Sequence, residues 1–152
     1  MTVTLRPAGW RDAWRLYRWR NDPSTGAWMF GPAPTPLNHL VWLSWILSAR
    51  SASRLYIGLD EKTGEVVGTG RLDNNPWNIP EVSVTVDHRR RNRGYGTAIV
   101  EALVAEARMS GAKAVRAYIM PSNEASIRTF FSAGFAYLDP VGSKIVMERR
   151  CD

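Results

Sequence analysis

The residues with the clearest chemical potential form a short basic run that contains glycine, R-N-R-G-Y-G, at residues 91–96. Its two glycines, Gly94 and Gly96, have no Cβ, so another molecule can approach the backbone closely. In the segment that follows, residues 97–109, apolar side chains recur at helical spacing. The N-terminus of a helix presents unpaired N–H groups and the positive end of the helix dipole, which together bind phosphate. The sequence therefore predicts a phosphate-binding loop, with a basic loop that only caps a helix as the alternative.

A predicted strand precedes this loop. Residues 81–86, E-V-S-V-T-V, alternate in character and are rich in β-branched side chains. Two familiar phosphate motifs do not fit here. The dinucleotide-binding fingerprint would need glycine at the position of Ile99, and the P-loop pattern G-x-x-x-x-G-K-[ST] is absent from the sequence. Residues 91–96 therefore match neither the dinucleotide-binding fingerprint nor the P-loop.

A second strand and helix follow further along the chain. Residues 114–119, A-V-R-A-Y-I, read as a strand, and P-S-N-E-A-S-I-R-T-F-F-S-A-G-F follows at residues 121–135. Ser122 or Asn123 can cap a helix at its start, and Gly134 fits its C-terminal end. This segment predicts a capped helix packed after a strand.

Together these segments resemble the GNAT family of N-acetyltransferases. The R-x-x-G-x-G run between strand and helix is similar to the family's acetyl-CoA pyrophosphate motif, and an Asn opening a helix that ends in Gly-Phe is similar to a second motif. L-R-P at residues 5–7, W-R-N-D-P at 19–23 and V-V-G at 66–68 resemble one branch, which acetylates nucleotide sugars, protein N-termini and polyamines. The resemblance covers nearly the whole chain and is stronger in the half that binds CoA.

The length and composition of the chain are compatible with membership of the GNAT family. A chain of 152 residues supports one domain, residues 1–152. No apolar run of 18 residues exists, so no membrane association is expected. The single cysteine, Cys151, excludes an internal disulfide, which fits a reducing cytoplasm. Its distance in sequence from the two histidines gives no recognisable metal site, so no metal is expected.

The net charge of +6 admits a second class of partner. Residues 89–93 are mostly arginine, and such a run suits either the phosphates of coenzyme A or a nucleic acid. An RNA-binding domain is disfavoured because no aromatic-rich basic strand motif is present. Nucleic acid is therefore not the expected partner, and a homodimer stays an open possibility.

Hydrophobic periodicity and turn residues predict an α/β fold with a mixed sheet, in the order β-α-α-β-β-β-α-β-α-β-β. This order matches that of the GNAT family element by element, so the resemblance implies a GNAT-like mixed central sheet. The predicted strands are residues 2–6, 55–59, 65–72, 81–86, 114–119, 135–138 and 144–149. The predicted helices are residues 11–20, 36 to about 48, 97–109, and the one opened by Asn123.

The resemblance implies where acetyl-CoA binds. The pantetheine arm lies along residues 81–86, beside a strand that pairs only partly, and a backbone N–H near Val84 to Val86 stabilises the oxyanion of the reaction. The pyrophosphate lies on N–H groups of residues 91–97, and Asn123 holds the pantetheine or a water. The expected cofactor-binding residues are Val84, Thr85, Val86, Arg91, Asn92, Arg93, Gly94, Tyr95, Gly96, Thr97, Asn123, Ser126 and Phe130.

The resemblance also implies the proton transfers. An alkyl amine has a pKa near ~10.4, so a general base helps it to attack as the neutral form. Glu81 matches a Glu common at this place in the related branch, and a solvent-exposed strand-end carboxylate is the alternative. Many relatives protonate the leaving thiolate with a Tyr seven residues after the motif Asn, where this chain has Phe130. Either the thiolate leaves unprotonated, or Tyr118 or Tyr137 takes that role.

The acceptor half carries most of the aromatic residues. Trp14 and Trp45, at helical spacing, are expected in the core. Trp28 and Phe30 lie in a Gly/Pro-rich loop that borders the acceptor in the family, and with Trp77 they are expected to stack on a sugar or a base.

Two polar residues of the acceptor half, Arg20 and His39, also have structural interpretations. Arg20 is expected to pair with an acceptor phosphate or with a structural carboxylate such as Asp22. His39 is expected to be a satisfied histidine on a helix face rather than a catalyst.

The resulting hypothesis is an acetyl-CoA-dependent N-acetyltransferase that acts on a small-molecule primary amine. A nucleotide-linked amino sugar is the favoured acceptor and a protein N-terminus the next. The alternative is a non-catalytic acyl-CoA-binding or sensing module on the same fold, which the Phe at position 130 keeps open.

Overall fold

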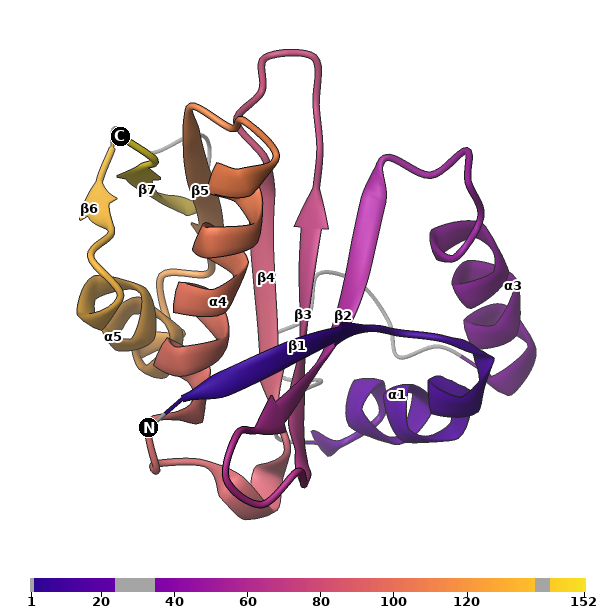
Figure 1. The fold of residues 1–152 in the computed structure, drawn as a ribbon. Helices are drawn as coiled ribbons and strands as arrows, with labels where there is room; N and C mark the ends of the chain where they lie inside the picture. Colours follow the sequence, from indigo (N-terminus) through magenta and orange to yellow (C-terminus); the bar gives the residue numbers. More distant parts are fainter. Residues whose placement is uncertain (1, 24–34, 139–142) are drawn as a thin grey trace.

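The computed structural model describes residues 2–23, 35–138 and 143–152, and its elements follow the predicted order (Figure 1). The strands are β1 (Val3–Pro7), β2 (Ser53–Asp60), β3 (Val66–Asp73), β4 (Glu81–Val86), β5 (Ala114–Ile119), β6 (Ala136–Tyr137) and β7 (Ile145–Arg150). The helices are α1 (Ala13–Arg20), α3 (Pro36–Ile46), α4 (Tyr95–Met109) and α5 (Glu124–Ser132), with single 3-10 turns at Trp10–Asp12 and His88–Arg90.

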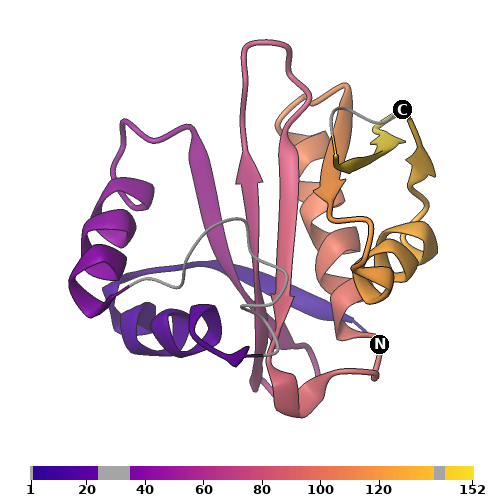
Figure 2. The same ribbon diagram turned by 180° about the vertical axis from the view of Figure 1, so that it is seen from behind.

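The described strands form one mixed sheet in the order β1-β2-β3-β4-β5-β7-β6. All neighbours pair antiparallel except β4 and β5, which run parallel. Figures 1 and 2 show α4 and α5 on one side of the molecule and α1 and α3 on the other. The predicted α/β fold with a GNAT-like sheet is confirmed.

Alternation along the strands builds a separate apolar core on each face of the sheet. The larger core joins α4 and α5 to the sheet through side chains such as Val82, Ile99 and Leu103. The smaller core joins α1 and α3 to β2 through Leu43 and Ile57, both fully buried. Each helix pair is thus held against its own face of the sheet.

Glycines on β3 let α4 lie close to the sheet. A Cβ on Gly70 would come within 2.7 Å of Leu103 Cδ1, and one on Gly68 would collide with the backbone oxygen of Thr85. The V-V-G segment at residues 66–68 therefore has a packing reason for its glycine.

Arg6, in the L-R-P segment, fixes the entry into α1. Its guanidinium donates to both carboxylate oxygens of Asp12, at 2.7 and 2.9 Å, and the Gly9 N–H donates to the same carboxylate at 2.9 Å. Burial alone would raise the pKa of Asp12, but these hydrogen bonds outweigh it and leave the pKa below its usual value. The segment therefore has a structural role.

No helix in the described ranges combines the length and the apolar character that crossing a membrane requires.

Candidate functional site

A cleft opens where β4 and β5 part. The two strands are in register at Glu81 and Arg116, the single pair recorded between them in the described chain, and beyond it they diverge. The cleft has a volume of about 830 Å³ and runs along residues 82–86 from the start of α4 towards α1 and α3. The partly paired strand that the family resemblance implied is therefore present.

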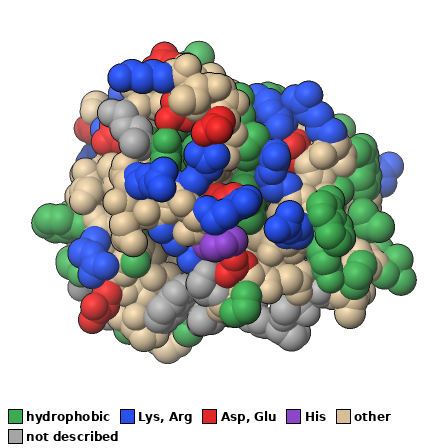
Figure 3. All heavy atoms as spheres, turned by 90° about the horizontal axis from the view of Figure 1, so that it is seen from below, with side chains coloured by type: hydrophobic (Ala, Val, Ile, Leu, Met, Phe, Trp, Pro, Cys, Tyr) green, Lys and Arg blue, Asp and Glu red, His purple; other side chains and the backbone are tan. Residues whose placement is uncertain are grey.

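Loop 91–96 turns sharply at one end of this cleft. Asn92 and Gly94 have left-handed backbones, with φ of 61° and 88°, and α4 begins at Tyr95. No side chain of the described residues caps this helix, so the N–H groups of its first turn face the cleft end without a capping partner. Arg90, Arg91 and Arg128 line the cleft. Seen from below, the molecule carries many Lys and Arg side chains on the face where this loop lies (Figure 3).

The side chain of Tyr95 has a structural role. It is buried, and its hydroxyl donates a hydrogen bond of 2.6 Å to Asp60, which raises the pKa of Tyr95 and lowers that of Asp60. Gly96 makes room for α5, because a Cβ there would lie 3.2 Å from Thr129 Cγ2. Both residues therefore anchor the loop, and Gly96 is constrained by protein packing as well as by any ligand.

Most expected cofactor-binding residues meet in the cleft. Those that line it are Val84, Thr85, Val86, Arg91, Asn92, Gly94, Tyr95, Gly96, Thr97, Asn123, Ser126 and Phe130, whereas Arg93 is exposed outside it. The Asn123 side chain caps α5 by accepting from the Ser126 N–H at 3.2 Å. An elongated cleft with uncapped helical N–H groups and arginines at one end fits a cofactor that carries phosphates, such as acetyl-CoA.

Glu81 opens β4 at the point where β4 and β5 still pair, and it does not itself line the cleft, although the next residues, Val82 and Ser83, do. It is half-buried and lies opposite Asp73 of β3 in the sheet register. Burial raises the pKa of Glu81, and the negative charge of Asp73 raises it further. A carboxyl group with a raised pKa is a stronger base than an ordinary glutamate once it is ionised.

Tyr118 and Tyr137, the two candidate proton donors, and Phe130, which stands where many relatives have a tyrosine, lie in different environments. Tyr118 lines the cleft and is half-buried. Phe130 is only 2% exposed and packs edge-on against Phe135, with ring centroids 5.1 Å apart. Tyr137 is exposed on β6, the strand at the far edge of the sheet, and is not among the residues that line the cleft. The cleft thus contains one of the two tyrosines that the sequence suggested.

Arg20 lies at the other end of the cleft, on α1. Its guanidinium stacks over Trp42 at 4.1 Å from the ring centroid and lies 3.2 Å from His39 Nδ1. His39 Nε2 lies 2.9 Å from the carbonyl oxygen of Ala13 and must donate to it, so Nδ1 accepts from Arg20 and the ring is neutral. Burial and the nearby Arg20 charge lower the pKa of His39, although the bond to Ala13 opposes this. The carboxylate of Asp22 pairs with His88 Nδ1 at 2.9 Å.

The expected core positions of Trp14 and Trp45 are wrong. Their side chains are 68% and 57% exposed. Helical spacing alone did not say which face turns inward, and in the smaller core α1 instead contributes Leu16 and Trp19. Trp77 is also exposed, in the loop between β3 and β4, and does not line the cleft. Trp28 and Phe30 lie outside the described residues.

Sequence reasoning missed the polar residues of β3 that face this end of the cleft. Thr69 and Arg71 line it, and each is paired in register with a cleft residue of β4, Thr85 and Ser83. The alternation of residues 65–72 was the available signal, but it could not tell which face would meet the cleft.

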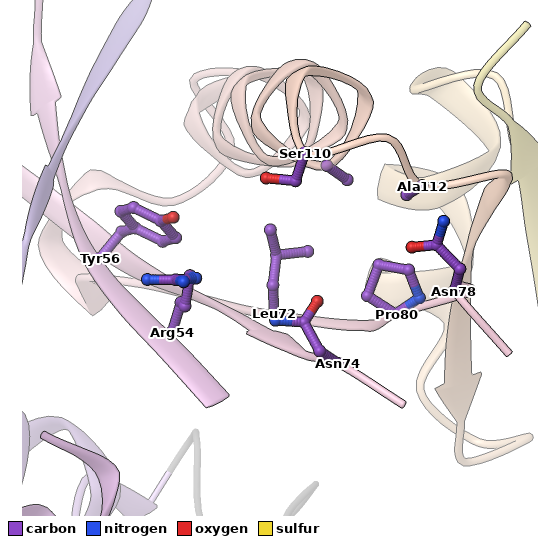
Figure 4. Close-up of a pocket in the computed structure, with 9 residues that line it drawn as sticks. Arg54, Tyr56, Leu72, Asn74, Asn78, Pro80, Ser110 and Ala112 are labelled. Carbon is purple, nitrogen blue, oxygen red and sulfur yellow. The ribbon is translucent and has the colours of Figure 1, made fainter. Parts of the chain in front are cut away.

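A second cavity, of about 180 Å³, lies between the far ends of β2 to β4 and the C-terminal end of α4. Figure 4 shows Arg54, Tyr56 and Asn74 around it, together with Ser110. None of its described lining residues also lines the larger cleft, and it is too small for a nucleotide-sized ligand.

Comparison with known proteins agrees with this geometry. Residues 2–136 match the family model described as the acetyltransferase (GNAT) domain. The fold is similar to that of the aminoglycoside acetyltransferase AAC(6')-Ib in complex with coenzyme A and kanamycin, with 21% identity, a TM-score of 0.86, and coverage of 98% of this chain and 95% of that chain.

Two further solved structures share the fold. Spermidine N-acetyltransferase from Vibrio cholerae, in complex with CoA and spermine, has 13% identity, a TM-score of 0.81, and coverage of 97% and 93%. The GNAT domain of S. lividans PAT has 22% identity, a TM-score of 0.78, and coverage of 97% and 90%.

The family match spans most of the chain, and the cleft lies between two strands that part and ends at the N-terminus of α4. The chain belongs to the GNAT acetyltransferase family and is an N-acetyltransferase that uses acetyl-CoA.

Proposed function

We propose that this enzyme acetylates the primary amine of a small acceptor that enters the cleft from the side of α1 and α3. A nucleotide-linked amino sugar is the favoured acceptor and a protein N-terminus the next. The observation that carries the proposal is the divergence of β4 from β5 after the pair Glu81 and Arg116. It leaves one edge of residues 82–86 without a strand partner, between the phosphate loop and the polar residues of β3.

Acetyl-CoA, when bound, supplies the acetyl group as a thioester. We assign the N–H groups of residues 91–97, with Arg91 and Arg128, to its phosphates. Backbone N–H groups of residues 84–86 are assigned as donors to the negative charge that develops during acyl transfer. Asn123 and Ser126 border the same stretch of the cleft and complete the proposed cofactor site.

Two side chains are assigned to proton transfer. Glu81 receives the proton of the acceptor amine through a water, because it lies beside the cleft-lining residue Val82 without lining the cleft itself, and its raised pKa makes it a better base than an exposed carboxylate. Tyr118 donates to the leaving thiolate, since it lines the cleft and Phe130 has no proton to give. Tyr137 is not carried into the proposal because it lies outside the cleft.

The acceptor end has an aromatic and polar lining whose hydroxyls suit a sugar. Trp19 and Trp42 line it, as do Thr69 and Ser83. Hydroxyls supply hydrogen bonds, as in sites for sugars, whereas Trp19 is largely buried in the smaller core and one face of Trp42 is covered by Arg20. The loop residues Trp28 and Phe30 stay predicted acceptor contacts.

The test is acetyl transfer from acetyl-CoA to a panel of amines, followed by product mass. The panel contains an amino sugar, its nucleotide-linked form, a peptide with a free N-terminus and a polyamine. The proposal expects the nucleotide-linked amino sugar to have the highest kcat/KM. CoA binding by calorimetry without acetylation of any amine would instead support the non-catalytic acyl-CoA-binding module.

A further inference from the structure

We propose that Arg20 and Arg71 form a subsite for an acidic group, phosphate or carboxylate, on the acceptor, so that the enzyme selects anionic amines over polycationic ones. This inference rests on the proposed function and names its substrate class. Both side chains line the acceptor end of the cleft, Arg20 from α1 and Arg71 from β3.

The charge of the cleft is one-sided. Its described lining contains five arginines and no aspartate or glutamate. Three of these arginines, Arg90, Arg91 and Arg128, belong to the end with the phosphate loop and α5. The remaining two are Arg20 and Arg71. Arg71 is paired with Asp73, whereas Arg20 has no carboxylate at ion-pair distance in the described chain, so a polycationic amine would meet a net positive charge at the acceptor end. Like charges at short range repel by more in a cleft than in water.

Arg20 is half-buried, and no residue of the described ranges serves as its counter-ion. Within the described residues no carboxylate lies at ion-pair distance from it, and its recorded contacts are the ring of Trp42 and the Nδ1 of His39. Burial lowers the pKa of Arg20, and the charge of Arg71 lowers it further. A bound anion would offset both the cost of burying the Arg20 charge and its repulsion from Arg71, because a paired and hydrogen-bonded charge is far less costly to bury than an isolated one.

The surroundings hold Arg20 in one orientation. Stacking on Trp42 fixes the plane of the guanidinium, and His39 accepts from one Nη1. His39 is itself held by the carbonyl of Ala13 on α1. A fixed guanidinium loses little freedom when it binds phosphate or carboxylate through two parallel hydrogen bonds. His39 and Trp42 are thus positioning residues for Arg20.

Arg71 supplies a second donor from the sheet. Its Nε pairs with Asp73 at 3.1 Å, which orients the side chain, and its exposed fraction is 31%. It lies opposite Ser83 of β4 in the sheet register. Arg20 and Arg71 both line the acceptor end of the cleft, so we assign the acidic group to a position that both guanidinium groups contact.

Matched acceptors test the inference. Glucosamine is the reference, glucosamine 6-phosphate is the phosphate arm, glucosaminic acid is the carboxylate arm, and spermidine is the polycation. The variant is Arg20→Met, which keeps side-chain length, and the control is Arg18→Met, an exposed arginine on the same helix. Binding of each acceptor to the enzyme with CoA is measured by calorimetry, and transfer by kcat/KM.

We expect at least one acidic arm to exceed glucosamine in kcat/KM, and spermidine to be the poorest acceptor. Arg20→Met should reduce binding of that acidic acceptor by about 10- to 100-fold, the range for a hydrogen bond to a charged group. Its effect on glucosamine and on CoA affinity should be less than about threefold, and Arg18→Met should change neither. If Arg20→Met does not fold, Arg20→Lys should show the same selective loss, since Lys cannot pair bidentately.

The four acceptors also distinguish a failure of the proposed subsite from a failure of the proposed acetyl transfer. Equal or better transfer to glucosamine or spermidine overturns the subsite while leaving the proposed acetyl transfer intact. A fall in CoA affinity in Arg20→Met would move Arg20 to the cofactor site and overturn it as well. No transfer to any amine, with CoA still bound, would reject the proposed function, and loss of acidic-acceptor binding in Arg20→Met would still support the subsite.

Discussion

Glu81 on β4 is paired in register with Arg116 on β5, and this pair marks the point from which the two strands separate. The opposite edge of β4 pairs with β3 along its whole length, from Glu81 with Asp73 to Val86 with Gly68. The same strand is therefore held firmly on one side and open on the other. A backbone that is rigid and has free hydrogen-bonding groups is what a site for acyl transfer needs.

Gly96 gives a direct test of the cofactor loop. Gly96→Val places side-chain atoms at the first turn of α4, against Thr129 and Val86. We expect affinity for CoA, measured by calorimetry, to fall at least about 10-fold, because the N–H groups at a helix N-terminus must approach the phosphates closely. Gly9→Val is the control, since a Cβ at Gly9 meets nothing within 4 Å.

Thermal melting of both variants separates binding from folding. The contact with Thr129 means that Gly96→Val should lose some stability, unlike Gly9→Val. A folded Gly96→Val protein with wild-type CoA affinity would show that the phosphates bind elsewhere.

Glu81→Gln tests the proposed base. The variant keeps shape and hydrogen bonding but removes basicity, so kcat/KM near pH 7 should fall by roughly 10²-fold. The deficit should shrink near pH 9 to 10, about where the acceptor amine is increasingly neutral. In the wild type, the acid limb of kcat/KM should lie above the ordinary glutamate range, because burial and Asp73 raise the pKa of Glu81. Glu61→Gln, an exposed carboxylate in the β2–β3 turn, is the control. Wild-type rates for Glu81→Gln at every pH would remove Glu81 from the mechanism.

Tyr118 and Tyr137 form a matched pair of variants. Tyr118 lines the cleft, whereas Tyr137 is exposed on β6. Tyr118→Phe should lower kcat by about 10²-fold at most, because a thiol of pKa ~8.5 is already a tolerable leaving group. Tyr137→Phe should leave kcat unchanged. Single-turnover rates with a good acceptor measure the step directly, and equal rates for the two variants would mean that the thiolate leaves without a proton from Tyr118.

His39 predicts how stability depends on pH. Its pKa is lowered in the folded protein, mainly by burial, so near pH 6.5 the unfolded chain binds a proton that the folded protein does not. Stability therefore falls as the pH drops through this value, with a slope of at most about 1.4 kcal/mol per pH unit from this group. Urea unfolding of the wild type and of His39→Asn, at about pH 7.5 and about pH 5.5, measures it. Asn can still accept from Arg20 but does not titrate, so an unchanged slope in the variant would contradict the assignment.

Local pattern predicted most of the elements, and most of the residues it offered for the cofactor line the cleft. The strand at residues 81–86, the glycine turn and the helix after it are adjacent in sequence, so the pattern of this one segment was enough to predict how the three elements follow one another. The Asn123 cap, which the sequence offered as one of two options, is confirmed by its bond to the Ser126 N–H.

The acceptor half depends on contacts between distant segments. Arg20, for example, meets His39 across 19 residues. Arg71 reaches the cleft only because β3 presents that face towards α1 and α3. Periodicity gives the spacing of a face but not its orientation, which is also why Trp14 and Trp45 were placed in the core wrongly.

The most direct test of the central claim is the acetyl-CoA-dependent mass change of an amine acceptor, with Gly96→Val run in parallel. The account predicts an acetylated product with at least one amine that carries an acidic group, and a rate that drops in Gly96→Val at limiting acetyl-CoA. Tight CoA binding with no acetylated product from any amine would contradict it.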